Sequence, residues 1–390
     1  MTVMENMAKG TIEILSPGRL CLFGEHSDWA AEYGIHRGHC IVVGTDQCIR
    51  ADVCPSDDFR VETLVPDEMG RPSGRTRQMS CPWDDELLLA AAKDQNEFFR
   101  YCAGVAYEIK RRRNISTGLD IRIKEMELPL KKGVSSSAAV CILVAKAFNE
   151  VYDLCLFPNE LMEMSYLGER LTGSQCGRMD QACIYGSVPV LLAFEKGKDV
   201  KIEPIFAKDD IYTFYVDLAG KKNTVRILKD LHENYLKDEK LQTALGVRNE
   251  HIVRRAFQVI QRGKAKELGE LMTEAQRIFD DAVAMHSREL AAPLLHELLV
   301  FSDIQPYICG GKGVGSQGDG TAQFVAKSLE DRDRSMEKIT TSFPQMRCFP
   351  LTIRGNVLVE TDSQSRLQPT IPVQENGTRD RIGALSKVVT

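Results

Sequence analysis

The residues best suited to bind a phosphorylated ligand lie between a predicted strand and a predicted helix. Residues 129–139 read PLKKGVSSSAA. Small residues let the backbone approach a polyphosphate, and the helix that follows offers free N–H groups and the positive end of its dipole. A single serine here is typical of an ordinary helix cap, but three serines after a glycine favour a phosphate loop. The candidate ligands are Gly133, Val134, Ser135, Ser136, Ser137 and Ala138.

A second polar group follows the first predicted strand, in the segment SPGRLCLFGEHSDW at residues 16–29. Arg19 stands between apolar strand positions, where an unpaired guanidinium is costly to bury, so we expect it to meet a carboxylate or a phosphate. Glu25, His26 and Asp28 crowd a turn directly after a glycine. Such side chains can donate and accept the hydrogen bonds of a polyol, although a solvated turn can have the same composition.

Two further carboxylates lie in the segment GERLTGSQCGRMDQ at residues 168–181. Asp180 follows an apolar residue in a stretch of small residues, which favours a buried carboxylate, and Arg19 is its candidate partner. Glu169 lies on the preceding predicted helix. In phosphoryl transfer, one of these carboxylates would bind magnesium and the other would lie at the substrate hydroxyl. Each acid taken alone is more often a surface residue.

A third glycine-rich segment matches a dinucleotide-binding pattern only superficially. Residues 313–318, GVGSQG, fit G-x-G-x-x-G. That pattern indicates a Rossmann site only when a helix follows it, and residues 321–326, TAQFVA, predict a strand instead. No G-x-x-x-x-G-K-[ST] segment occurs in the chain, so the sequence does not predict a P-loop.

Composition narrows the class of protein further. A length of 390 residues favours two domains. The formal net charge of −5 gives no overall positive charge that would attract a nucleic-acid backbone. No apolar run reaches the roughly 18 residues of a membrane span, and residues 1–14 do not predict a signal peptide. The twelve cysteines include no C-x-x-C pair. We therefore expect a cytoplasmic protein with reduced thiols and no nucleic-acid or membrane partner, either a monomer or a small homo-oligomer.

Hydrophobic periodicity predicts alternating strands and helices in two domains with a boundary near residue 205. In the first domain we expect strands at 11–15 and 20–23, broken by Pro17-Gly18, and further strands at 39–54 and 118–124, with helices at 85–113, at 138–152 and from 158. In the second we expect strands at 211–218, 321–326 and 347–353, three helical stretches over 222–300, a glycine-dense loop at 310–320 and a helix at 329–342. The expected domains are residues 1–205 and 206–362, followed by a surface tail at 363–390.

Taken in order, these segments resemble the motifs of the GHMP kinases, the superfamily of galactokinase, homoserine kinase, mevalonate kinase and phosphomevalonate kinase. SPGRLCLFGEHSDW is similar to the first motif in its galactokinase form, and PLKKGVSSSAA to the second, with the triple serine of galactokinases. GERLTGSQCGRMDQ resembles the segment that carries the magnesium-ligand glutamate and the catalytic aspartate. GGKGVGSQGDG at 310–320 occupies the place of the third, glycine-rich motif.

The resemblance implies a fold and a role for each motif. The fold is α+β with two domains: an N-terminal domain like domain 2 of ribosomal protein S5, and a ferredoxin-like C-terminal domain. Asp180 is then the catalytic aspartate, with Arg19 to keep it ionised, while Ser137 and Glu169 ligate Mg²⁺. The phosphate loop binds ATP together with the third-motif residues Gly313, Gly315 and Ser316. Glu25, His26 and Asp28 bind the sugar.

The sequence departs from the family pattern at three places. Gln317 and Asp319 interrupt the glycine run of the third motif, where an acid could weaken nucleotide binding. Residues 30–37, AAEYGIHR, replace the Asn-Gly-Gly that commonly follows the galactokinase motif. Lys131 and Lys132 replace small residues before the phosphate-loop glycine, and their charge could favour an acidic substrate.

The resulting hypothesis is an ATP-dependent sugar kinase that phosphorylates the anomeric hydroxyl of a monosaccharide. One alternative is a mevalonate-type or other non-sugar kinase of the same superfamily, against which Asp28 argues because a carboxylate suits a polyol better than an anionic acid. Another is a sugar sensor that binds without turnover. A Rossmann oxidoreductase is the most distant alternative.

Overall fold

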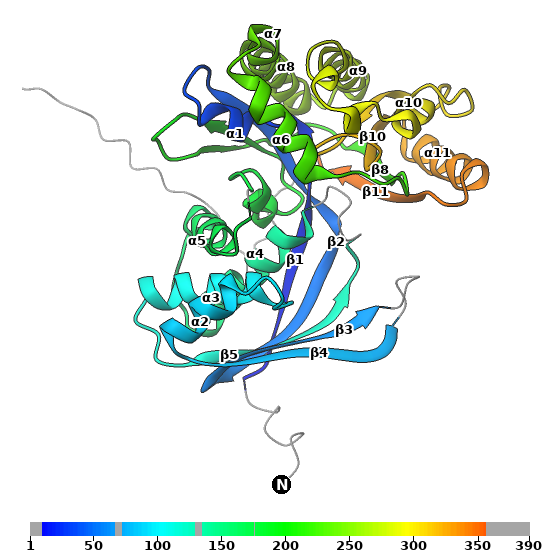
Figure 1. Ribbon diagram of the computed structural model, residues 1–390. Helices are drawn as coiled ribbons and strands as arrows, with labels where there is room; N and C mark the ends of the chain where they lie inside the picture. The colour runs from blue at the N-terminus through cyan, green and yellow to red at the C-terminus, as the bar shows by residue number, and fades with distance from the viewer. Residues whose placement is uncertain (1–9, 67–71, 129–134, 175, 356–390) are drawn as a thin grey trace, which may run out of the picture. The chain divides into compact units, whose positions relative to one another are not determined.

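The protein is described here from a computed structural model that covers residues 10–66, 72–128, 135–174 and 176–355 (Figure 1). These residues belong to one compact unit, which spans residues 1–358. Gly133, Val134 and the expected tail at 363–390 lie outside the described residues. The expected domain boundary near residue 205 stays a prediction.

The first sheet has seven strands among the described residues, in the order β4-β3-β5-β2-β6-β7 with β1 paired to β2. The long strand β2 has three partners, because β5 pairs with its second half, β6 with its first, and β1 with most of its length. The strands are β1 (Ile12–Phe23), β2 (Gly38–Ser56), β3 (Asp58–Pro66), β4 (Pro72–Pro82), β5 (Gly118–Met126), β6 (Val190–Phe194) and β7 (Lys201–Pro204). The sequence analysis missed β3, β4, β6 and β7, which are short, or polar on one face.

Four helices pack against one another and cover one face of this sheet (Figure 1). They are α2 (Asp85–Lys93), α3 (Arg100–Arg112), α4 (Ser136–Val151) and α5 (Pro158–Leu171). The single helix expected over 85–113 is wrong, because Asp94 has extended backbone and its side chain accepts the N–H of Asn96, which closes a turn. Helices α3 and α5 touch through their backbones: a Cβ atom at Gly104 would lie 2.2 Å from the carbonyl oxygen of Gly168.

The second sheet has four antiparallel strands in the order β11-β8-β10-β9. The strands are β8 (Ile211–Asp217), β9 (Ile308–Gly313), β10 (Thr321–Ala326) and β11 (Arg347–Ile353). Helix α9 (Ala265–Ala282) packs on β9 and β10, and α11 (Leu329–Ser342) on β8 and β11. This β-α-β-β-α-β arrangement is ferredoxin-like, as expected. The strand that follows the glycine-rich segment is confirmed as β10, so no Rossmann unit forms. The loop expected at 310–320 is partly wrong, since its first four residues belong to β9.

The remaining helices and helical turns lie between these elements along the chain. They are α1 (Ser27–Ala31), α6 (Thr224–Tyr235), α7 (Glu239–Thr243), the π-helical turn η3 (Ala244–Arg248), α8 (Asn249–Gln261), α10 (Pro293–Leu299), and the 3₁₀ turns η2 (Asp180–Tyr185), η4 (Ala284–His286) and η5 (Arg288–Leu290). Helix α8 contacts both β1 and β2 of the first sheet and α9 beside the second.

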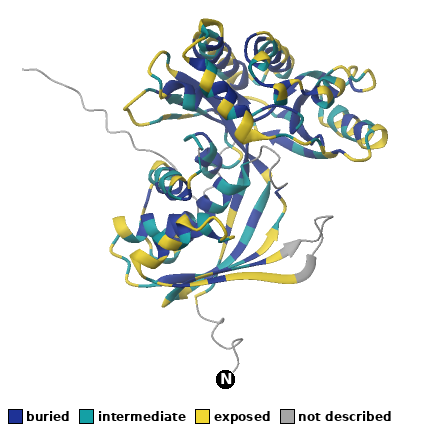
Figure 2. Cartoon of the chain, in the orientation of Figure 1, coloured by how far each residue is buried: buried dark blue, intermediate teal, exposed yellow. Residues whose placement is uncertain are grey.

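One buried apolar cluster runs from the strands of the first sheet through α3 and α4 to α8 and α9 (Figure 2). A smaller cluster lies under α10 and α11, against β8 and β10. The two-sheet α+β architecture expected from the sequence is therefore confirmed. No helix of the described residues is long and apolar enough to cross a membrane.

Candidate functional site

The guanidinium of Arg19 binds the carboxylate of Asp180. Arg19 lies on β1 and is buried, and its Nη2 donates to Oδ1 of Asp180. The same nitrogen lies 3.3 Å from Oγ of Ser135, and that hydroxyl donates to the other carboxylate oxygen, Oδ2. The side chain of Asp180 remains 20% exposed. The partner predicted for Arg19 is confirmed, and the carboxylate is held in one orientation with one side open to solvent.

Ser135 also begins helix α4. Its backbone has φ 55°, in the left-handed region that a residue other than glycine rarely adopts. The first N–H groups of the helix, on Ser136, Ser137 and Ala138, have no carbonyl partner within the helix. The start of α4 therefore places unused donors and the positive end of a 16-residue helix beside the carboxylate of Asp180.

Glu169 lies in the last turn of α5 and is almost completely buried. Gln181 Nε2 donates to its Oε2 (2.9 Å), and Ser174 Oγ lies 3.5 Å from its Oε1. Burial is the main cause that raises the pKa of Glu169 to about 7, and the charge of Asp180 adds to it, against hydrogen bonds from Ser137, Gln181 and Ser174. Glu169 and Ser137, the two predicted magnesium ligands, are therefore in contact.

This pair of side chains fits a magnesium ion. Mg²⁺ prefers hard oxygen ligands, usually one or two carboxylates together with substrate phosphates and waters. Glu169 supplies a carboxylate and Ser137 a hydroxyl, and a bound cation would relieve the repulsion between Glu169 and Asp180. No group of three or more His, Cys, Asp or Glu side chains suited to a metal occurs within the described ranges. A metal held here would therefore complete its coordination with substrate and water.

Asp28 lies against the segment that leads to Asp180. It sits in the first turn of α1 and is buried. A Cβ atom at Gly177 would lie 1.8 Å from its Oδ2, so only glycine leaves room for the carboxylate there. Burial, with a smaller contribution from the charge of Asp180, raises the pKa of Asp28 to about 6.

His26 is held as a neutral ring. Trp29 Nε1 donates to His26 Nδ1 (3.0 Å), so the ring carries its proton on Nε2, and burial lowers the pKa of His26 to about 3. The Nε2 atom is buried beside the backbone of Ser316, with no hydrogen-bond partner of standard geometry in the described part of the chain. Its N–H is directed at the backbone carbonyl oxygen of Ser316.

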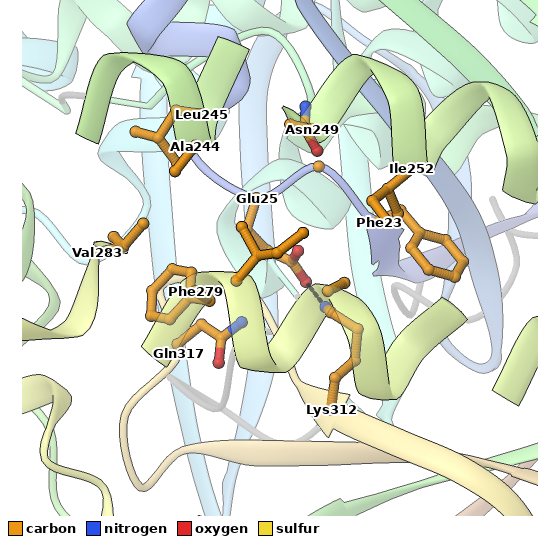
Figure 3. Close-up of a pocket in the computed structure, with 13 residues that line it drawn as sticks. Phe23, Glu25, Ala244, Leu245, Asn249, Ile252, Phe279, Val283, Lys312 and Gln317 are labelled. Atoms are coloured by element: carbon orange, nitrogen blue, oxygen red, sulfur yellow. Dashed lines mark hydrogen bonds and ion pairs between the residues drawn. The ribbon is translucent and has the colours of Figure 1, made fainter. Parts of the chain in front are cut away.

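Glu25, the third residue of this turn, pairs with a lysine that the sequence analysis did not single out. Lys312 Nζ donates to Glu25 Oε1 and to the carbonyl oxygen of Gly313 (2.7 Å), and the two side chains are only 1% and 5% exposed (Figure 3). The signal for Lys312 was a charged residue inside a buried strand, the same signal that identified Arg19.

The third-motif residues Gly313, Gly315 and Ser316 lie at the end of β9 and in the loop to β10. The Ser316 hydroxyl lies 3.2 Å from that of Thr224, at the start of α6. The two residues that interrupt the glycine run have structural partners. Gln317, with φ 62°, fills the space beside Gly313. Asp319 Oδ1 accepts the N–H of Leu295 (3.0 Å) and so caps α10.

Sequence and structure comparisons agree on one class of protein. Residues 100–187, which include the start of α4, Glu169 and Asp180, match the family described as the GHMP kinases N terminal domain. A galactokinase from Thermosipho africanus (strain TCF52B) is 26% identical over 171 residues, 44% of this chain and 42% of that protein. This match therefore spans less than half the length of that relative.

Solved structures resemble the fold over nearly the whole chain. The structure of Lactococcus lactis galactokinase with galactose matches with a TM-score of 0.66 and 16% identity, over 91% of this chain and 99% of that one. The structure of L. major mevalonate kinase with R-mevalonate matches with a TM-score of 0.65 and 19% identity, over 90% and 98%. Residues 100–187 thus match the N-terminal domain of the GHMP kinases, and the chain has the mixed α+β fold of the solved GHMP kinase structures.

Proposed function

We propose that the protein is an ATP-dependent phosphotransferase that phosphorylates a monosaccharide at its anomeric hydroxyl. The observation that carries this proposal is the arrangement of Asp180, which is bound by Arg19 and Ser135 at the start of α4, with Glu169 and Ser137 beside it. This arrangement supplies a carboxylate for the acceptor hydroxyl, donors for phosphate oxygens and oxygen ligands for a metal.

Each residue has a definite part in this mechanism. Asp180 accepts or orients the proton of the acceptor hydroxyl, and Arg19 holds its carboxylate in place. Ser135 fixes the second carboxylate oxygen, and the N–H groups at the start of α4 stabilise charge on the phosphoryl oxygens. Mg²⁺ bound at Glu169 and Ser137 would neutralise charge on the nucleotide phosphates.

The turn of Glu25, His26 and Asp28 supports a sugar as the acceptor. Asp28 and His26 are buried polar side chains, of the kind that can exchange hydrogen bonds with hydroxyl groups. Fold similarity does not separate a sugar from mevalonate, because the two solved kinases named above match equally well.

The test is ADP release from Mg²⁺-ATP with a panel of free sugars, uronic acids, inositols, mevalonate and homoserine. We expect turnover with a sugar, and NMR of the product then identifies the phosphorylated hydroxyl. Turnover with mevalonate alone would refute the sugar proposal but keep a phosphotransferase. Sugar binding by calorimetry without turnover would indicate a sensor.

Asp180→Asn tests the catalytic assignment directly. We expect its turnover to fall by at least about 10²-fold, with ATP affinity nearly unchanged. Asp199→Asn is the matched control, because Asp199 is exposed and its substitution should leave turnover at the wild-type rate. Near-normal turnover in Asp180→Asn would disprove the assignment.

A further inference from the structure

A cavity of about 40 Å³ lies beside the Glu25–Lys312 pair (Figure 3). This is more than twice the roughly 10–15 Å³ that a single water molecule needs by the same kind of measure. The cavity is enclosed by the end of β1, by η3, α8 and α9, and by β9 with the loop after it. Most of its lining is apolar and includes Phe23, Leu245, Ile252, Ile278, Phe279 and Val283.

The charges that line the cavity neutralise each other. Glu25 and Lys312 form a buried ion pair, and the lysine also donates to the carbonyl oxygen of Gly313. A ligand that carries its own charge into this space would leave that charge unbalanced in a poorly solvated site, which is costly. The cavity therefore favours an uncharged group.

Two amide side chains complete the lining. Asn249 Nδ2 donates to the carbonyl oxygen of His39 (2.7 Å), which fixes that amide. Gln317 lines the cavity beside Lys312 (Figure 3), with its Oε1 atom close to the α-carbon of Gly313. Its Oε1 atom is buried and has no hydrogen-bond partner in the part of the chain that the structure describes. A hydroxyl of a ligand would satisfy this acceptor.

The cavity borders the turn that carries the predicted acceptor-binding residues. Gly24 and Glu25 line it, and the same turn continues through His26 to Asp28, which lies against Gly177 and within electrostatic reach of Asp180. An acceptor whose reacting hydroxyl lies at Asp180 would therefore extend its far end toward the cavity.

We propose that the cavity binds a methyl-sized alkyl group of a neutral acceptor, and that the acceptor is a deoxy sugar such as a 6-deoxyhexose. This inference rests on the proposed function and names its substrate class. The apolar wall takes the methyl group, Gln317 orients a neighbouring hydroxyl, and the Glu25–Lys312 pair excludes a carboxylate from the same place.

The test uses sets of sugars that share ring configuration and differ only at the sixth carbon. One set is D-fucose, D-galactose and D-galacturonate, and the L-fucose with L-galactose and L-rhamnose with L-mannose pairs cover other configurations. Binding is measured by calorimetry without ATP, and kcat/KM by ADP release. We expect the deoxy sugar of one set to be preferred at least about tenfold over its hydroxymethyl counterpart, with the carboxylate weakest, since an apolar pocket rejects an added hydroxyl by up to about a hundredfold.

Two variants locate this selectivity in the cavity. Ala275→Leu on α9 fills the space, so the ratio of kcat/KM for the deoxy sugar to that for its hydroxymethyl counterpart should fall toward one. Ala265→Leu, in the first turn of the same helix and outside the lining, is the control and should keep the wild-type ratio. Glu25→Gln leaves Lys312 without its carboxylate, so the hexuronate should gain affinity relative to the deoxy sugar.

The outcomes separate this inference from the proposed function. Turnover of sugars without a deoxy preference would overturn the deoxy-sugar inference and keep the kinase. Deoxy-selective binding that is lost in Ala275→Leu, with no turnover, would support the cavity and refute the kinase. A preference that persists unchanged in Ala275→Leu, or no binding of any sugar, would overturn the inference.

Discussion

The carboxylate of Asp28 packs on the α-carbon of Gly177, where a Cβ atom would lie 1.8 Å from Oδ2. Asp28 belongs to the turn after β1, and Gly177 lies three residues before Asp180. One close contact therefore ties the predicted sugar-binding turn to the predicted catalytic carboxylate. Asp28 is buried at this contact and belongs to the first turn of α1.

Gly177→Ala should displace Asp28 and lower kcat/KM by at least about tenfold, because small misplacements of positioning groups have large effects on rate. Overpacking should also destabilise the protein by about 1–3 kcal/mol. The check is a double-mutant cycle by steady-state kinetics and thermal denaturation. In an Asp28→Ala background the added methyl has space, so Gly177→Ala should then have little further effect. Additive losses would show that the contact does not couple the two segments.

The raised pKa of Asp28 should make its contribution to stability depend on pH. The folded state holds the proton up to about pH 6, whereas an unfolded aspartate releases it near 4. Between these values the folded state binds more protons, so the contribution of Asp28 to the free energy of unfolding falls as pH rises through 6. Relative to wild type, Asp28→Asn should gain roughly 1 kcal/mol in unfolding free energy between pH 5 and pH 8.

The contribution of His26 to the free energy of unfolding should change with pH in the opposite direction, which makes His26 an internal control. Its pKa is lowered to about 3, so an unfolded histidine binds a proton below about 6.5 while the folded one does not. The contribution of His26 to stability is therefore complete above pH 6.5 and is lost as pH falls. Denaturant unfolding of wild type, Asp28→Asn and His26→Gln at several pH values should show the two opposed slopes. Parallel curves for all three proteins would contradict both assignments.

Ser137→Ala should raise the Mg²⁺ concentration needed for half-maximal turnover, by about tenfold, because it removes one candidate ligand and a hydrogen bond to Glu169. Maximal turnover at saturating Mg²⁺ should fall less than the metal affinity. Titration of activity with Mg²⁺ at fixed ATP measures this change. Ser187→Ala, on an exposed residue, should give the wild-type curve. An unchanged Mg²⁺ requirement in Ser137→Ala would remove Ser137 from the metal site.

The motifs could be predicted because each is a short stretch of sequence in which polar or charged residues stand next to apolar ones. Arg19 in a buried strand required a partner, and the structure pairs it with Asp180 as expected. The serines before an apolar helix indicated the start of α4, and the structure begins that helix at Ser136. Local sequence is sufficient for such features, since periodicity and helix starts are short-range signals.

Contacts between distant segments could not be predicted in the same way. Glu25 and Lys312 are separated by 287 positions, and nothing in either neighbourhood specifies the other. The room that Gly177 leaves for Asp28 is likewise a result of tertiary packing. Strand β3 was predictable, since its residues alternate between buried and exposed, whereas residues 75–82 of β4 are mostly exposed and polar.

Asp319 is the residue for which sequence and structure suggest different roles, and its removal distinguishes them. The sequence suggested an acid beside the nucleotide phosphates, but in the structure Oδ1 accepts the N–H of Leu295 (3.0 Å) in the first turn of α10. Residue Ala292, which precedes that helix, has no side-chain oxygen to cap it. Asp319→Ala should therefore lower the free energy of unfolding by about 1 kcal/mol, the usual effect of losing a cap.

The same variant should keep the wild-type KM for ATP, because the carboxylate is engaged at the helix rather than free for the ligand. Asp319→Asn keeps an oxygen acceptor and should lose less stability than Asp319→Ala. Thermal denaturation and steady-state kinetics on the three proteins measure both quantities. A lower KM for ATP in both variants, with unchanged stability, would instead mean that the negative charge acts on the nucleotide. The third motif would then be tuned by electrostatics and not by helix capping.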